Sequence, residues 1–160
     1  MRETIREAGG IPIETPIGHT LIKQQMKREN GFFAGELSGH YYFRDVSNFE
    51  APSLVINTIL NLVARSSVPF SQLVEPLRKY FHTGELNYHV DDKAGAMKRV
   101  EETFSDATIS HLDGVTIEYP DWWCNVRASN TENVLRLNLE AHTPELRDAK
   151  RAEVERLIAD

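Results

Sequence analysis

Cysteine is nearly absent from the sequence, because Cys124 is the only one among 160 residues. This excludes a disulfide within the chain and a zinc site built from several cysteines, and it fits the reducing environment of the cytoplasm. Positive charge is also scarce, since 18 Lys and Arg residues stand against 24 Asp and Glu residues, which gives a net charge of -6. We therefore expect no broad basic surface for a nucleic-acid backbone, and any anion site must be local.

Long apolar runs are missing as well. No stretch approaches the roughly 20 apolar residues that cross a bilayer, so we expect no membrane partner. The first seven residues are charged and lack the apolar centre of a signal peptide. They are typical of the middle of a helix, so we expect the chain to begin inside a domain. Because the signal-peptide pattern is missing and cysteine is nearly absent, we expect the protein to be cytoplasmic.

The remaining composition is that of an ordinary globular protein, with 41% apolar and 26% charged residues. In the first half, apolar residues at helical spacing predict helices over 2–8, 19–27, 52–65 and 71–81, the last interrupted at Pro76. Ile11-Pro12-Ile13 predicts a short edge strand, and Phe32-Phe33-Ala34 predicts a buried strand that leads into a glycine-bounded turn. A strand, a turn and then a helix indicate an α/β segment.

A change of pattern at Thr83-Gly84 predicts a domain boundary. Beyond it, period-two alternation predicts strands over 86–90, 107–109, 115–119, 122–126 and 134–141. Asp92 is placed to cap a helix that runs to Phe104, and Pro144 is placed to open a final amphipathic helix. We therefore expect an α+β domain with a mostly antiparallel sheet and two helices on one face.

The segment between the last two of these strands carries the densest polar pattern. Ser129, Asn130 and Thr131 are turn formers whose side chains and backbone amides can point into one concavity. Arg127 and Arg136, on the flanking strands, can reach the same place, and a guanidinium fork matches phosphate oxygens. The segment is therefore either a small phosphate clamp or a surface hairpin with solvated arginines.

Two other segments carry candidate binding groups. Within the turn 35–40, Glu36, Ser38 and His40 alternate, and a carboxylate beside a hydroxyl suits the vicinal hydroxyls of a sugar. The alternative is a β-turn with capping residues. Lys23 lies one helical turn beyond His19, where it can meet a phosphate or take part in proton transfer, or simply be solvated.

Taken together, these segments resemble one family. Gly9-Gly10, the run 15–19 with Ile22-Lys23, the turn 35–40 and the loop 127–132 occur in the order and spacing of the α-D-phosphohexomutases, that is, phosphomannomutase and phosphoglucomutase. Residues 1–82 resemble the latter half of the family's third domain, and residues 84–160 resemble its complete fourth domain. The first segment is therefore expected to be part of a three-layer α/β/α domain.

The resemblance implies an intramolecular phosphotransferase that interconverts hexose 1- and 6-phosphates. A phosphoserine in the first domain transfers its phosphoryl group, and magnesium and a hexose bisphosphate activator are expected for the full-length enzyme. The family's sugar contacts carry over to Glu36 and Ser38, and its acid/base or electrostatic groups to Lys23 and His40. The non-reacting phosphate is held by a set in the fourth domain, namely Arg127, Ser129, Asn130, Thr131 and Arg136.

Two family motifs are not found in this sequence. The phosphoserine loop reads Ser-His-Asn-Pro, whereas Ser110-His111 is followed by Leu-Asp; the magnesium loop reads Asp-Gly-Asp, whereas Asp113-Gly114 is followed by Val115. We therefore expect that the chain binds no metal itself, that it depends on missing N-terminal domains of the same enzyme, and that it has no mutase activity alone. We also expect residues 1–82 to associate or be poorly soluble, and residues 84–160 to fold alone.

Two alternative functions differ in class from an enzyme part. The first is a non-catalytic module that binds sugar phosphates through the same loops. The second is a metal protein that uses the six histidines, which the spacing disfavours because no His-x-x-x-His pair occurs among positions 19, 40, 82, 89, 111 and 142.

Overall fold

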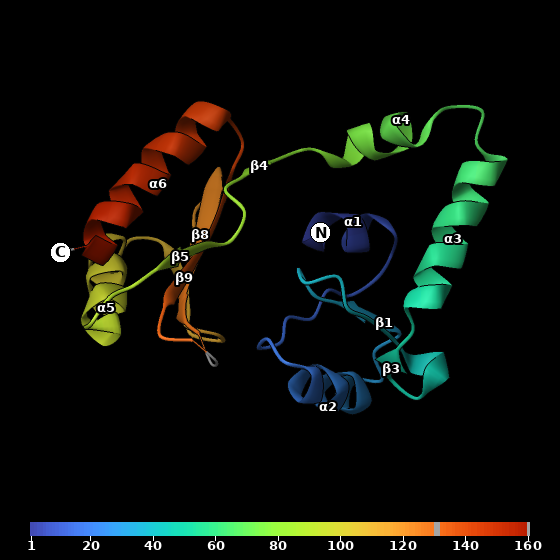
Figure 1. The fold of residues 1–160 in the computed structure, drawn as a ribbon, viewed down its shortest axis with the longest axis horizontal. Coiled ribbons are helices and arrows are strands. Elements are labelled where there is room, and N and C mark those ends of the chain that lie inside the picture. The colour runs from blue at the N-terminus through green and yellow to red at the C-terminus, as the bar shows by residue number, and fades with distance from the viewer. Residues whose placement is uncertain (130–131, 160) are drawn as a thin grey trace. The chain divides into compact units, whose positions relative to one another are not determined.

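The computed structural model describes residues 1–129 and 132–159 (Figure 1). The chain divides into two compact units, Met1–Ser67 and Val68–Asp160. Within the described residues, no helix combines the length and the apolar character needed to cross a membrane.

The first unit contains three helices and a small sheet. The helices are α1 (Arg2–Glu7), α2 (His19–Glu29) and α3 (Pro52–Arg65). The strands β1 (Phe33–Gly35), β2 (Tyr41–Phe43) and β3 (Phe49–Glu50) pair in the order β1-β2-β3, and a 3₁₀ turn (Arg44–Val46) separates the last two. Pro52 occupies the first turn of α3, where its missing N–H costs nothing, so the predicted bounds 52–65 are confirmed.

The prediction of a buried strand over 32–34 is wrong, because the strand that forms there is largely exposed. Both strand pairs are antiparallel, and the side chains of Phe32 and Phe33 are 63% and 48% exposed. The segment around Ile11 forms no strand, and Ile11 is 85% exposed. An apolar run favours burial, but burial also needs a second layer of structure. Among the described residues of this unit, the buried core consists of Ile22, Met26 and Tyr42, with Ala34 packed against it.

The second unit begins with short elements that correct another prediction. Helix α4 (Phe70–Val74) ends early and is followed by a 3₁₀ turn (Glu75–Leu77) and by strand β4 (Phe81–His82). The helix predicted over 71–81 is therefore too long, whereas its predicted interruption at Pro76 is confirmed. Pro76 lies inside the 3₁₀ turn, and because proline lacks an N–H and clashes with the preceding turn, it stops the α-helix there.

In the described part of the second unit, β4 joins five further strands in an antiparallel sheet that carries two helices. The sheet runs β4-β9-β8-β7-β6, and β5 also pairs with β9. The bounds are β5 (Leu86–Tyr88), β6 (Thr108–Ser110), β7 (Val115–Glu118), β8 (Trp122–Ala128) and β9 (Leu135–Ala141), with helices α5 (Lys93–Thr103) and α6 (Pro144–Ala159). The predicted cap is confirmed, because Asp92 Oδ1 accepts a bond of 2.8 Å from the Gly95 amide at the start of α5.

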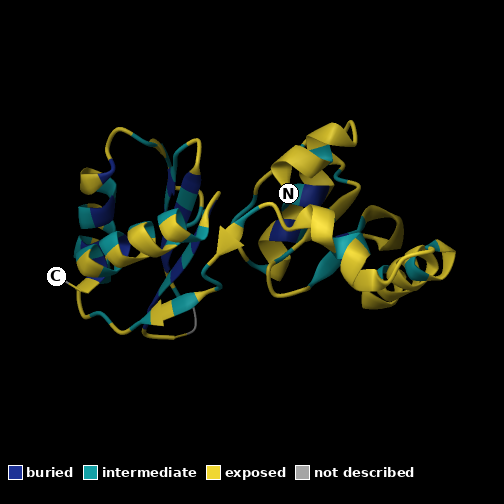
Figure 2. Cartoon of the chain, turned by 90° about the horizontal axis from the view of Figure 1, so that it is seen from above, coloured by how far each residue is buried: buried dark blue, intermediate teal, exposed yellow. Residues whose placement is uncertain are grey.

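The core of this unit lies between the sheet and its helices. Alternate residues of β8 and β9 are buried, so each strand has one apolar face and one polar face. Helix α5 packs on β7 and β8, and α6 packs on β9 and β4, both on the same side of the sheet (Figure 1). Figure 2 shows the buried residues concentrated in these strands and helices, which confirms the predicted α+β arrangement.

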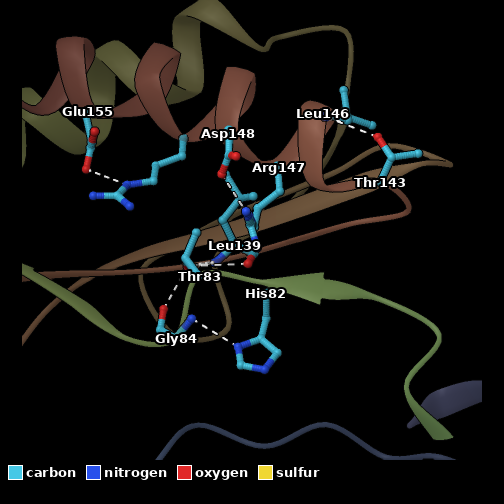
Figure 3. Close-up of polar contacts among 10 residues, drawn as sticks. His82, Thr83, Gly84, Leu139, Thr143, Leu146, Arg147, Asp148 and Glu155 are labelled. Atoms are coloured by element: carbon cyan, nitrogen blue, oxygen red, sulfur yellow. Dashed lines mark hydrogen bonds and ion pairs between the residues drawn. The ribbon is translucent and has the colours of Figure 1, made fainter. Parts of the chain in front are cut away.

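The segment around Thr83 is fixed to the sheet of the second unit (Figure 3). The Thr83 amide donates to Leu139 O at 2.9 Å, the Leu139 amide donates to Thr83 Oγ1 at 3.2 Å, and the Gly84 amide donates to His82 Nδ1 at 3.1 Å. The compact units divide between residues 67 and 68 instead. The domain boundary at Thr83-Gly84 therefore stays a prediction.

Candidate functional site

An arginine pair stands on the polar face of the second unit's sheet. Arg127 on β8 lies directly opposite Arg136 on β9, so both side chains leave the same face, away from the helices. Glu85 bridges them, with Oε2 accepting from Arg127 Nη2 at 3.3 Å and Oε1 facing Arg136 Nη1 at 3.1 Å. Arg136 Nη2 also donates to Glu132 Oε2 at 2.7 Å. Two guanidinium groups are thus held side by side by acidic partners.

This pair keeps unused hydrogen-bonding capacity. The Nε atoms of Arg127 and Arg136 are buried and have no hydrogen-bond partner among the residues that the structure describes. Arg127 as a whole is only 6% exposed. A buried donor without a partner costs about 1–3 kcal/mol, and a guanidinium binds oxyanions through several N–H groups at once. The arrangement is therefore suited to an anionic ligand with several oxygens.

The loop beside the arginine pair is closed by short-range bonds. The Ser129 amide donates to Val134 O at 2.9 Å, and the Glu132 amide donates to Ser129 Oγ at 3.2 Å. Asn130 and Thr131, which the sequence also nominates for the phosphate, lie outside the described residues. Within the described residues, Arg127, Ser129 and Arg136 therefore come from one hairpin, as the sequence predicted.

Glu85 is a site residue that the sequence reasoning missed. Strand β5 pairs with β9 so that Asn87 faces Arg136, and Glu85 lies two residues before Asn87. Residues two apart on an extended chain point to the same side, so Glu85 reaches the same face as the arginines. The alternation of Glu85 and Asn87 in the sequence indicates that their side chains share one face. It places Glu85 beside the arginines only when the register of β5 with β9 is known.

A second polar cluster is built on the hairpin between β1 and β2 in the first unit. Ser38 Oγ donates to Glu36 Oε2 at 2.7 Å and lies 2.8 Å from His40 Nδ1. The Glu36 amide donates to His40 O at 3.0 Å, and Gly39 has a φ of +83°, which a glycine adopts without strain. The turn thus brings together Glu36, Ser38 and His40, which the sequence nominated as sugar-binding and reacting groups.

Tyr42 supports the carboxylate of this cluster. Its hydroxyl donates to Glu36 Oε1 at 3.1 Å, and the residue is fully buried. Burial first, and the Glu36 carboxylate next, raise the pKa of Tyr42 above its ordinary value, so the hydroxyl stays a donor. The sequence reasoning missed Tyr42, since an aromatic residue on a strand predicts core packing and nothing more.

Helix α2 contributes His19 and Lys23 to the same region. The His19 Nδ1 atom pairs with Glu50 at the end of β3, and its ring centroid is 4.8 Å from that of His40. Lys23 Nζ lies 4.7 Å from the centroid of the Phe49 ring, and Lys23 lines a hollow of about 270 Å³. The other residues around that hollow are Thr20, Gln24, Lys27, Ser47 and Asn48.

Magnesium, which the family resemblance implies, does not fit the residues that are described here. Mg²⁺ demands nearly octahedral oxygen coordination. The Asp113 carbonyl accepts from Asn125 Nδ2 at 2.7 Å, and Gly114 turns the chain into β7, so this segment is a strand connection. His19, Glu36 and His40 come close together, but they offer two nitrogen atoms and one carboxylate. No step that uses magnesium can be assigned to them.

Comparisons with known proteins give one consistent result. The family model for phosphoglucomutase/phosphomannomutase, alpha/beta/alpha domain III, matches residues 1–80, and the model for the phosphoglucomutase/phosphomannomutase C-terminal domain matches residues 85–157. A phosphomannomutase of Methanocaldococcus jannaschii is 41% identical over 157 residues, which are 98% of this chain and 35% of that protein. A phosphomannomutase of Escherichia coli is 32% identical, again over 98% of this chain and 35% of its own length.

A solved structure agrees with these relatives. The X-ray structure of a phosphoglucomutase/phosphomannomutase family protein from Burkholderia thailandensis superposes with a TM-score of 0.82 at 28% identity, and the match covers 97% of this chain and 34% of that one. The chain therefore spans about a third of the length of the relatives that it matches.

Proposed function

The chain belongs to the phosphoglucomutase/phosphomannomutase family, and on this premise we propose that it is the substrate-binding, carboxy-terminal part of an enzyme that interconverts hexose 1- and 6-phosphates. The observation that carries the proposal is the pair Arg127 and Arg136, which Glu85 bridges and whose buried Nε atoms have no hydrogen-bond partner in the described part of the chain. A phosphate group satisfies such donors through several oxygens at once.

The phosphate site holds the end of the substrate that does not react. Arg127 and Arg136 supply the guanidinium groups, and Ser129 stands at the loop between their strands. Asn130 and Thr131 are assigned to the same phosphate by their positions in the sequence. Binding of a remote phosphate orients the reacting end, which is how binding energy lowers a barrier.

The sugar site is formed by the hairpin of the first unit. Glu36 and Ser38 already exchange a hydrogen bond of 2.7 Å, and the same acceptor and donor can serve two adjacent sugar hydroxyls. His40, which contacts Ser38, and Lys23 are the candidate acid/base or electrostatic groups near the reacting oxygen. Each unit is thus proposed to contact hexose phosphate through its own polar cluster.

If this site binds phosphate, the chain should bind glucose 1-phosphate with an affinity that depends on the planar guanidinium group of Arg136. The variant Arg136→Lys keeps the charge but removes the planar fork, so we expect affinity to fall about ten- to a hundredfold, the equivalent of about 1.5–3 kcal/mol for hydrogen bonds to a charged group. Titration calorimetry or ligand-observed NMR on the full chain measures the change.

The matched control for this experiment is Arg151→Lys. Arg151 lies on α6, pairs with Glu155 at 2.9 Å and has a side chain that is 45% exposed. Its replacement should leave affinity unchanged. If Arg136→Lys and Arg151→Lys bind glucose 1-phosphate with the same affinity, whether unchanged or reduced, the arginine pair is not part of the binding site.

Catalysis is assigned to a longer protein that includes this segment. We propose that the phosphoserine, the metal loop and the completing layers of the α/β/α domain belong to N-terminal domains, and that the protein works in the cytoplasm. A coupled assay of the 160-residue chain with glucose 1-phosphate, a hexose bisphosphate and magnesium should then show no turnover above a buffer blank. Turnover that survives repurification and is lost in Arg136→Lys would contradict this assignment.

A second candidate function, a non-catalytic sugar-phosphate-binding module, is favoured by one observation. Both polar clusters are formed by residues of this chain, one in each compact unit. Immunoblotting of source cells with an antibody to residues 84–160 separates the two candidates. A polypeptide several times larger than 18.2 kDa supports the enzyme part, and a band at 18.2 kDa supports the module.

A further inference from the structure

Two histidines and a glutamate that are distant in the sequence meet in the first unit. His19 is the first residue of α2, whereas Glu36 and His40 stand at the two ends of the turn between β1 and β2. One ligand atom from each of the three lies within 4.8 Å of those from the other two. Small rotations of the side chains would bring such atoms to about 3.3 Å from one another, the separation of tetrahedral ligands around a zinc ion at bond lengths of about 2.0–2.1 Å.

Neighbouring side chains fix which nitrogen each ring can offer. Ser38 has one hydroxyl hydrogen, which goes to Glu36 Oε2, so His40 Nδ1 must donate to Ser38 Oγ across 2.8 Å. His40 Nε2 then carries the lone pair. His19 in turn pairs through Nδ1 with Glu50 Oε1, which leaves Nε2 of that ring as the available nitrogen.

This pattern of outer contacts is the one that supports metal ligands in proteins. A metal-binding histidine donates its other N–H to a carboxylate, a carbonyl or a similar acceptor, and a metal-binding carboxylate is itself hydrogen-bonded. Glu50 serves His19, Ser38 serves His40, and Tyr42 donates to Glu36 Oε1 at 3.1 Å. Glu36 still has lone pairs on both oxygens, because each accepts one hydrogen bond from the residues that the structure describes.

We propose that His19, Glu36 and His40 form a binding site for a divalent transition metal such as Zn²⁺, with Glu50 as the positioning residue for His19. Two imidazoles and a carboxylate suit zinc, and water or a further oxygen completes the four ligands. The side chains of His19 and His40 are 52% and 41% exposed, so an ion can enter and both rings can adjust. The proposal goes beyond the mutase function, which gives this hairpin no metal.

The test uses the tag-free, full chain and zinc or cobalt alone, with no sugar present, so that its result does not depend on the proposed function. Calorimetry with Zn²⁺ should show one equivalent bound, and Co²⁺ should develop the visible bands of a tetrahedral site. We expect His19→Ala and His40→Ala to lose binding. Glu50→Gln should weaken it about 10–100-fold, as outer-contact changes do in other metal sites.

The matched control is His89→Ala, which removes an exposed histidine outside the cluster and should leave zinc affinity unchanged. Circular dichroism of each variant separates loss of a ligand from loss of fold. Absence of a one-to-one zinc complex in the unaltered chain would overturn the proposal. So would an affinity that falls equally in His40→Ala and His89→Ala, since that pattern indicates binding to scattered surface histidines.

Discussion

Replacing Gly114 with alanine is expected to destabilise the second unit by about 2–5 kcal/mol, the sum of a left-handed conformation forced on alanine and a steric overlap. Gly114 has a φ of +73° at the start of β7. A Cβ atom there would lie 2.4 Å from Val126 O and 2.6 Å from Arg127 Cβ, so part of the clash is with backbone that cannot rotate away. Denaturant unfolding followed by tryptophan fluorescence measures the loss.

Gly84 supplies the matched control for the conformational part of this effect. It has a similar φ of +70°, but a Cβ atom built on it meets nothing within 4 Å. Gly84→Ala should therefore cost only the left-handed conformation, about 1–2 kcal/mol. If both variants lose the same free energy of unfolding, the close approach of Gly114 to β8 does not contribute to the effect.

The Gly114→Ala substitution is also expected to affect the phosphate site. The added Cβ atom would lie 2.8 Å from the Cα atom and 2.6 Å from the Cβ atom of Arg127. Any relaxation that makes room for the new methyl group moves the Arg127 backbone and, with it, the guanidinium that Glu85 holds. The folded fraction of Gly114→Ala is therefore expected to bind glucose 1-phosphate more weakly than the folded Gly84→Ala chain.

Local sequence signals were sufficient for much of the second unit. The alternation along 134–141 and the proline at 144 predicted β9 and α6, and both are present. Asp92 predicted the start of α5 because a cap is decided by residues within one turn. The same locality explains α3, whose bounds follow from Pro52 and a continuous apolar pattern.

The failures lie where the outcome depends on partners distant in the sequence. Phe33 has a strand former's side chain, yet its exposure is decided by whether another layer covers β1. Glu85 could be assigned to the arginines only through the register of β5 with β9. His19 and His40, dismissed as scattered, meet because a hairpin and a helix start are folded against each other. Spacing rules for metal ligands describe ligands on one element and miss such pairs.

Replacing Leu137 with alanine is expected to remove about 2–5 kcal/mol from the stability of the second unit, because it leaves a cavity that the rigid sheet cannot close. Leu137 is fully buried, faces Leu86 on β5 and Val126 on β8, and belongs to the core beneath the helices.

The single thiol of the chain allows the opening of this unit to be measured directly. Cys124 is fully buried, and burial raises the pKa of its thiol to about 12.

Since only the thiolate reacts, a thiol reagent at pH 8 should label Cys124 only after the second unit opens. The labelling rate reports the equilibrium between closed and open states when closing is fast, so Leu137→Ala should accelerate labelling in proportion to the lost stability, at least about thirtyfold for 2 kcal/mol. Leu62→Ala on α3, whose side chain is 61% exposed, is the control and should change the rate by less than about threefold. Rapid labelling of the unaltered chain would contradict a closed core around β8, and equal rates for the two variants would show that Leu137 does not support the unit that contains the arginine pair.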